Sequence, residues 1–244
     1  MQTIGSRAPR RAQGWAAAVG VALGLMAAGG LAQAQPKASP YPTMAAPGAY
    51  RIPSRADEIA LARSAAPASI SDKAEVLVLG DAGYETAVKG SNGFVCMVHR
   101  SWGNDFDDAE FWNPKIRSPI CFNAESVRSV LPTYLTRTTW VLAGTSVAEM
   151  RSRTKAALDS GAIRPPEAGA MCYMMSKQGY ASDKAGGAWR AHLMFFVPRV
   201  PPEAWGANLP GVPMFGGASS VEPLSVFFVP VERWSDGSPD HAGH

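Results

Sequence analysis

The part of the chain best suited to chemistry is the segment 102–112, which reads Trp-Gly-Asn-Asp-Phe-Asp-Asp-Ala-Glu-Phe-Trp. It places four carboxylates among aromatic rings, and its candidate binding residues are Trp102, Asp105, Asp107, Asp108, Glu110 and Trp112. Aromatic faces stack on sugars or attract cations, and carboxylates accept hydrogen bonds from hydroxyl or amine groups. The segment therefore predicts a site for a small molecule or a glycan, which Trp189 from a later loop could join. The alternative is a surface loop whose rings pack on the domain while its acids face water.

A second group of residues could support catalysis. His99 and His192 each lie in an apolar segment expected to form a strand. With Cys172 as the nucleophile they would form a hydrolase site, and the acids of the loop 105–110 offer a second hydrolytic arrangement. The alternative is that each histidine is satisfied by a backbone carbonyl. Because the sequence contains no Gly-x-Ser-x-Gly elbow and no recognisable acid/base spacing, binding is favoured over catalysis.

The first 34 residues have the three parts of a secretory signal peptide. Three arginines without an acid come first, an apolar run covers residues 15–31, and Ala32-Gln33-Ala34 supplies the small residues that signal peptidase requires. We therefore expect a protein that begins at Gln35, lies in the periplasm or outside the cell, and keeps no transmembrane anchor after cleavage.

Removing this leader changes the charge of the protein. The whole chain has 23 Lys+Arg and 20 Asp+Glu, and the leader holds three arginines, so 23 − 3 = 20 basic residues balance 20 acids. No basic block remains that would bind nucleic acid. The cysteine spacings exclude a zinc site built from paired Cys-x-x-Cys motifs, and methionines beside Cys172 are typical of core packing. We expect neither a metal nor another cofactor, and the sequence leaves the oligomeric state open.

Three cysteines would enter an oxidising compartment, which favours one disulfide and one free thiol. Cys96 and Cys121 bracket the polar loop, so we expect them to be bonded and Cys172 to be free. The other two pairings remain possible, as does a reduced protein in which all three are small buried residues.

The remaining sequence indicates one α+β domain at residues 54–234, between a disordered tether rich in Pro, Ala and Ser (35–53) and a flexible polar tail (235–244). Strand patterns occur at residues 75–79, 84–88, 94–100, 170–176, 192–197 and 224–231. Helix patterns occur at 55–65, from Ala124 onward with an interruption at Pro132, and at 147–160.

Strands and helices that are segregated along a chain favour an α+β fold over an alternating parallel one. We expect one mainly antiparallel sheet of about six strands, three N-terminal and three C-terminal, with a central pair of helices packed on it. Short glycine-containing loops predict that the first three strands form an antiparallel meander. The resulting hypothesis is an exported domain that binds an envelope-associated small molecule or glycan, with a hydrolase as the alternative.

Overall fold

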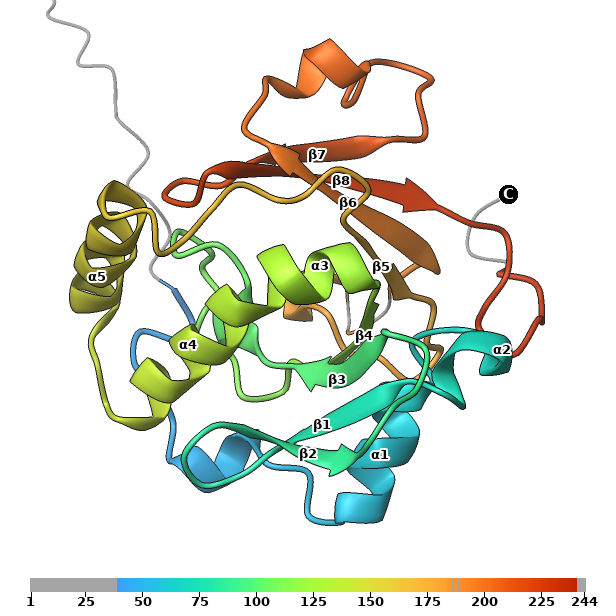
Figure 1. The fold of residues 1–244 in the computed structure, drawn as a ribbon, viewed down its shortest axis with the longest axis horizontal. Helices are drawn as coiled ribbons and strands as arrows, with labels where there is room; N and C mark the ends of the chain where they lie inside the picture. The colour runs from blue at the N-terminus through green and yellow to red at the C-terminus, as the bar shows by residue number, and fades with distance from the viewer. Residues whose placement is uncertain (1–38, 186, 188, 241–244) are drawn as a thin grey trace, which may run out of the picture. The chain divides into compact units, whose positions relative to one another are not determined.

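The computed structural model describes residues 39–185, 187 and 189–240, which belong to the compact unit Ala38–His244. Its centre is an eight-stranded sheet (Figure 1). The strands are β1 (Glu75–Leu79), β2 (Tyr84–Val88), β3 (Val95–His99), β4 (Ser118–Phe122), β5 (Met171–Met174), β6 (His192–Pro198), β7 (Phe215–Ala218) and β8 (Leu224–Pro230). Their order is β2-β1-β3-β4-β5-β6-β8-β7, in which only β1 and β3 pair in parallel. The predicted α+β class with a mainly antiparallel sheet is confirmed.

Three of the five α-helices in the described residues begin at a residue whose side chain caps the first turn. The helices are α1 (Arg55–Arg63), α2 (Ala68–Ser71), α3 (Ala124–Ser129), α4 (Leu131–Leu142) and α5 (Val147–Asp159). Short 3-10 turns occur elsewhere in the chain, such as Pro47–Tyr50 before α1 and Pro202–Trp205 between β6 and β7. The side chains of Ser54, Asn123 and Ser146 accept backbone hydrogen bonds at the starts of α1, α3 and α5. Each cap satisfies an N–H that would otherwise lack a partner.

Two strands were missed in the prediction of six. The segment of β4 contains Pro119, which argues against a central strand because proline has no N–H to donate. The structure accommodates Pro119 because β5 pairs only with Cys121 and Phe122, at the other end of β4. The segment of β7 reads Phe-Gly-Gly-Ala, which resembles a loop, yet it pairs along its whole length with β8.

The predicted antiparallel meander of the first three strands is wrong. β1 lies between β2 and β3, and it pairs antiparallel with β2 but parallel with β3. Burial explains this order, since all five residues of β3 are buried whereas β2 carries the exposed residues Glu85 and Thr86. The apolar strand therefore takes a central place, and the polar strand takes the edge.

Residues 39–53, expected to be a disordered tether, are packed on the domain. The Tyr50 side chain is fully buried, its hydroxyl donates to the carbonyl of Trp112 at 2.9 Å, and its ring lies 4.8 Å from the Trp102 ring. Arg100, also fully buried, donates from Nε to the Tyr50 carbonyl at 2.7 Å and from Nη2 to Glu58 Oε1 at 2.8 Å. A segment whose Pro- and Ala-rich composition cannot form its own core is thus ordered by partners elsewhere in the chain.

The predicted flexible tail is also held in place where the structure describes it. The Ser235 N–H donates to the Met175 carbonyl at 2.9 Å, and the Asp240 N–H donates to the Glu232 carbonyl at 2.8 Å. Residues 241–244 of that predicted tail, and the predicted signal peptide at 1–34, lie outside the described residues. Within the described part of the chain, no helix is long and apolar enough to cross a membrane.

The sheet separates two hydrophobic clusters, because side chains alternate between its faces. One face carries Met97, Ile120, Phe122 and Cys172 toward α3 and α4, which cover it in Figure 1. The other face carries Val76, Val98 and the two remaining cysteines toward the alanines of α1. A third cluster gathers Tyr50, Trp102, Phe106 and Phe111 against Met150 of α5.

Cys96 and Cys121 are direct partners in the register of β3 and β4, and they form a disulfide. Cys172 is free and buried in β5. The predicted pairing is therefore confirmed. It fixes two adjacent strands on either side of the long loop that contains the acidic segment.

Candidate ligand-binding cavity

A cavity of about 590 Å³ lies on the α4 side of the sheet. Its floor comes from strands, and its walls come from α4, the loop after β3 and the β7–β8 hairpin. The lining includes His99, Ile120, Tyr134, Arg137, Met174, Trp189, His192, Met194, Phe215, Glu222, Leu224, Val226 and Phe228. Both its volume and its mainly apolar, aromatic lining are typical of a small-molecule site.

Sheet register brings the floor residues together from distant parts of the sequence. His192 of β6 lies opposite Met174 of β5 on one side and Pro230 of β8 on the other. Met194, two residues further along β6, lies opposite Phe228. Residues opposite one another in adjacent strands share a face of the sheet, and residues two apart along a strand do as well.

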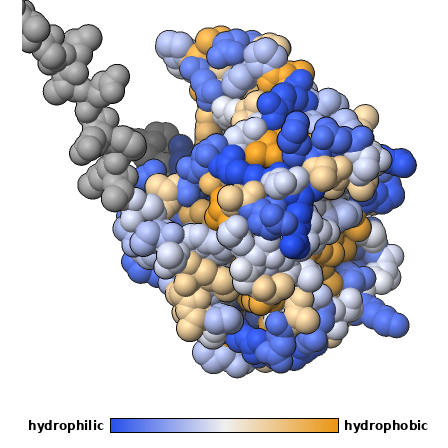
Figure 2. Space-filling view, turned by 90° about the vertical axis from the view of Figure 1, so that its left-hand side faces the viewer, coloured by the Kyte–Doolittle hydropathy of each residue, from blue (hydrophilic) through white to orange (hydrophobic). Residues whose placement is uncertain are grey.

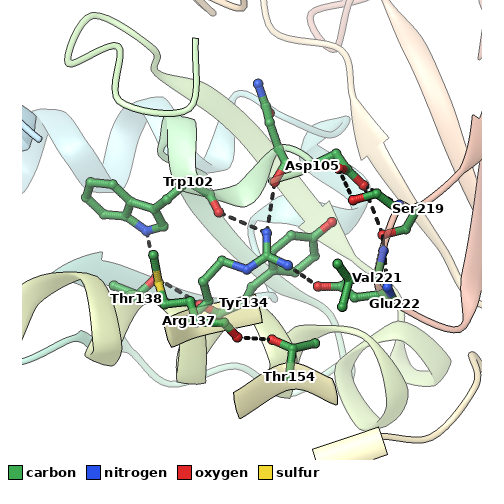
Figure 3. A network of polar contacts seen from close by, with 12 residues as sticks. Trp102, Asp105, Tyr134, Arg137, Thr138, Thr154, Ser219, Val221 and Glu222 are labelled. Carbon is green, nitrogen blue, oxygen red and sulfur yellow. Dashed lines mark hydrogen bonds and ion pairs between the residues drawn. The ribbon is translucent and has the colours of Figure 1, made fainter. Parts of the chain in front are cut away.

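A buried ion pair forms one wall of the cavity (Figure 3). Arg137 of α4 is paired through Nη2 with Glu222, and its Nη1 donates to the carbonyls of Trp102 at 3.0 Å and Asn104 at 2.8 Å. Burial raises the pKa of Glu222, and the positive charge of Arg137 opposes that rise. The pair therefore holds α4, the loop after β3 and the β7–β8 hairpin together at the cavity.

Asp105 makes a second connection between the same loop and hairpin. Its carboxylate accepts hydrogen bonds from the Ser219 hydroxyl at 3.0 Å, the Ser220 N–H at 2.8 Å and the Ser220 hydroxyl at 2.5 Å. Burial would raise the pKa of Asp105, but these hydrogen bonds outweigh it and leave the pKa below its usual value. Asp105 is thus an ionised structural contact on the cavity wall.

His192 lines the cavity with a neutral ring. Its Nδ1 lies 2.7 Å from the Arg190 carbonyl oxygen, which can only accept, so Nδ1 carries the proton. Burial lowers the pKa of His192, so the ring is neutral at pH 7 and Nε2 holds a lone pair. That Nε2 is buried and has no hydrogen-bond partner among the described residues. The ring itself is fixed between Trp189 and Phe228, each 5.5 Å away between centroids.

His99 is packed closely against Tyr134 and Gly103. Its ring lies edge-on to Tyr134 at 4.6 Å, and a Cβ placed on Gly103 would lie 1.4 Å from its Nε2. Burial, together with the positive charges of Arg137 and Arg100, lowers the pKa of His99 to about 3. The ring is therefore neutral, and only glycine leaves room for it at position 103.

Most of the predicted binding residues of the acidic loop are engaged elsewhere. Asp105 and Asp108 line the cavity, as does Trp189. Asp107 is paired with Arg151 at the surface, and Glu110 is buried, accepting hydrogen bonds from Asn113, Ser182 and the Asp183 N–H. The described residues contain no cluster of three or more His, Cys, Asp or Glu that could hold a metal ion.

The two predicted tryptophans of the loop face the protein. Trp102 is buried and its Nε1 donates to the Thr138 hydroxyl at 2.9 Å. Trp112 is partly buried and packs edge-on against Phe111 at 4.7 Å. Neither ring lines the cavity, so the structure does not bring them together with Trp189 around one groove.

The structure does not assemble the residues of the hydrolase alternative into a reactive group. Cys172 does not line the cavity, and burial raises the pKa of its thiol, which disfavours the nucleophilic thiolate. His99 and His192 lie on β3 and β6, three strand spacings or roughly 14 Å apart. Two histidines so far apart cannot share one proton transfer.

Sequence reasoning missed Tyr134, Arg137 and Glu222. Arg137 lies between hydrophobic positions of α4, where a charged residue with no neighbour of opposite charge on the helix is a sign of a long-range partner. Glu222 lies in a loop, and nothing local distinguishes it. No protein-family model, curated protein or solved structure matches this chain.

Proposed function

We propose that this protein is an exported, non-catalytic domain that binds a small, largely apolar molecule in the cavity beside α4. The observation that carries the proposal is a cavity of about 590 Å³ with a mainly apolar, aromatic lining. His99 and His192 both line the cavity, and the Nε2 atom of each is buried without a partner among the described residues. A buried polar atom without a partner costs free energy, which a bound donor that reached it would recover. The preferred ligand therefore carries a hydroxyl or N–H group at one end.

Of the two ligand classes expected from the sequence, this lining favours a small molecule over a glycan. A glycan presents many hydroxyl groups that need polar partners, whereas aliphatic and aromatic side chains dominate the cavity. Phe215, Phe228 and Tyr134 offer ring faces and edges against which a flat or aliphatic ligand can pack. The Cys96–Cys121 disulfide supports export, since such bonds persist in oxidising compartments.

N-phenyl-1-naphthylamine, a neutral aromatic amine with one N–H donor, tests the proposal as a fluorescent probe. We expect a single saturable site on the wild-type chain. Val226→Trp, on the cavity floor, should abolish binding, whereas Val229→Trp on the same strand does not line the cavity and should retain it. His192→Phe should weaken binding about tenfold, because one hydrogen bond to the ligand is lost. If circular dichroism shows that both proteins are folded, equal binding by the wild type and Val226→Trp would refute the proposal.

A further inference from the structure

The exposed large hydrophobic side chains of the described residues gather in one segment. Their exposed fractions are 45 % for Trp205, 45 % for Leu209, 41 % for Val212 and 48 % for Phe215. The segment comprises the 3-10 turn Pro202–Trp205, the following loop and the start of β7, and it projects at the top of Figure 1. By contrast, Figure 2 shows hydrophobic residues in separate patches over the α5 side of the molecule. Single exposed hydrophobic residues are ordinary, but their concentration in one projection indicates a contact surface.

Residues 204–215 of the projection carry no charge, and the exposed Glu203 lies just before them in the chain. The sequence has no Asp, Glu, Lys or Arg between Glu203 and Glu222. Protein-binding patches normally have a polar rim around an apolar centre, whereas the interface of a bilayer accepts apolar and aromatic side chains and disfavours charged ones. The uncharged, apolar part 204–215 of the projection therefore matches a lipid surface better than it matches another protein.

Several backbone groups of the projection form hydrogen bonds within it. Asn208, with φ of 63°, donates from Nδ2 to the Gly216 carbonyl at 2.8 Å and accepts from the Gly216 N–H at 3.1 Å. The Asn208 N–H donates to the Met214 carbonyl, and the Val212 N–H donates to the Leu209 carbonyl, both at 3.1 Å. Each backbone hydrogen bond made inside the loop lowers the free-energy cost of moving the loop from water into an apolar environment.

Two of the exposed rings are already fixed in position. Trp205 stacks on the buried Phe227 at 4.8 Å, and Phe215 stacks on Phe228 at 4.9 Å, each nearly parallel. Little side-chain entropy remains to be lost on contact with a surface. Phe215 and Phe228 also line the cavity, so the projection is continuous with the cavity wall.

We propose that the segment 204–215 docks on a lipid bilayer by placing Trp205, Leu209, Val212 and Phe215 in its interfacial region. The driving force is burial of apolar surface, with the Trp205 indole at the level of the headgroups. Because the segment is uncharged, docking requires no anionic lipid and persists at high salt. The cavity ligand plays no part in this contact, so the proposal stands whether or not the cavity binds a small molecule.

Hydrogen–deuterium exchange on the full chain, with and without phosphatidylcholine vesicles, tests the proposal. Exchange is read peptide by peptide, so any separate effect of the apolar residues 15–31 is distinguished from docking of this segment. We expect vesicles to slow exchange in peptides covering 204–215 at least about tenfold, in both low and high salt. Peptides of β1 and β2, at the other end of the sheet, should not change.

Leu209→Asp combined with Val212→Asp should remove this protection, because two carboxylates must then be dehydrated. The matched control, Ser91→Asp combined with Gln178→Asp, adds the same charge at exposed positions outside the segment and should keep it. Absence of protection in the wild type, or equal loss in both double variants, overturns the proposal. Protection without vesicles that grows with protein concentration would assign the segment to self-association and also overturn it.

Discussion

The Asp105 carboxylate accepts both the N–H and the hydroxyl of Ser220, at 2.8 and 2.5 Å, across 115 positions of sequence. This contact joins the loop after β3 to the turn that connects β7 with β8. The same two parts of the chain meet again through the carbonyl groups that Arg137 binds and the Glu222 carboxylate. Two polar contacts between segments that are far apart in the sequence thus hold one wall of the cavity together.

Asp105→Asn should lower the free energy of unfolding by about 1 kcal/mol at pH 7, because charged hydrogen bonds are lost at a partly exposed site. The pKa of Asp105 is lower in the folded protein than its usual value, so its contribution is complete above the unfolded pKa of about 3.9. The contribution is lost as the pH falls through the folded pKa. Urea unfolding at pH 7, 5, 4 and 3 should therefore show the difference shrinking below about pH 4.

Asp107→Asn is the matched control for this prediction. Asp107 lies in the same loop but is exposed and paired only with Arg151 at the surface. Its replacement should change the free energy of unfolding by no more than about 0.5 kcal/mol at any pH. A difference for Asp105→Asn that does not vary with pH would argue against an ionised contact.

Arg137→Met should destabilise the protein by about 3–5 kcal/mol, since it leaves the Glu222 carboxylate buried without its partner. Replacing both residues, as Arg137→Met with Glu222→Leu, should cost less than the two single changes added together. A double-mutant cycle measured by urea unfolding gives this coupling. The exposed pair Arg153 and Glu149 serves as reference, and its coupling should be below about 1 kcal/mol. Additive effects at Arg137 and Glu222 would show that the pair is not coupled.

Gly103→Ala should destabilise the protein by about 1–3 kcal/mol, because the new methyl group would overlap the His99 ring. Gly48→Ala is the control, since a Cβ there meets nothing within 4 Å. Thermal unfolding of both variants measures the contrast. Adding His99→Ala to Gly103→Ala should recover part of the loss, and failure to do so would mean that the strain lies elsewhere.

Replacing Cys96 and Cys121 by alanine should lower the free energy of unfolding by about 3.5 kcal/mol, from the entropy of closing the chain between them. Cys172→Ala, which leaves the disulfide intact, serves as the comparison. Non-reducing peptide mapping should link the peptides of residues 96 and 121. In the folded protein Cys172 should resist alkylation, because burial both blocks access to the thiol and raises its pKa.

Expression in the parent cell with the leader intact should yield a protein whose first residue is Gln35. The physical reason is the small-residue motif Ala32-Gln33-Ala34 after an apolar run. N-terminal sequencing of the protein recovered from outside the cytoplasm measures it. Recovery from the cytoplasm with residues 1–34 still attached would contradict the prediction.

The elements of the fold followed closely from local patterns. β1 and β2 begin and end where alternation and glycine loops place them, and α5 begins at its Ser146 cap. The order of the strands in the sheet could not be predicted from the same patterns. A strand pairs with the strand beside which its apolar residues are buried, and this need not be its neighbour in the sequence. β4 escaped detection because it contains Pro119, which has no N–H to donate; in the structure Pro119 is in register with Val98 of β3 but pairs with no residue of β5.

The candidate site was harder to predict than the fold, for a physical reason. An acidic, aromatic loop has the composition of a binding site, but its acids are equally suited to holding loops together, as Asp105 and Glu110 do. The cavity is built from alternate residues of several strands, and each of those positions looks like ordinary core in isolation. His192 becomes notable only once Nδ1 is seen to be satisfied while Nε2 is not.

The amide of Asn208 covers the outer side of β7, the last strand of the sheet, by pairing with both polar groups of Gly216. The opposite edge strand, β2, carries Glu85, whose charge disfavours pairing with a strand of another molecule, whereas β7 has no charged residue. Solubility at that edge therefore relies on one uncharged side chain. Losing it would expose a hydrophobic template for strand addition and intermolecular aggregation.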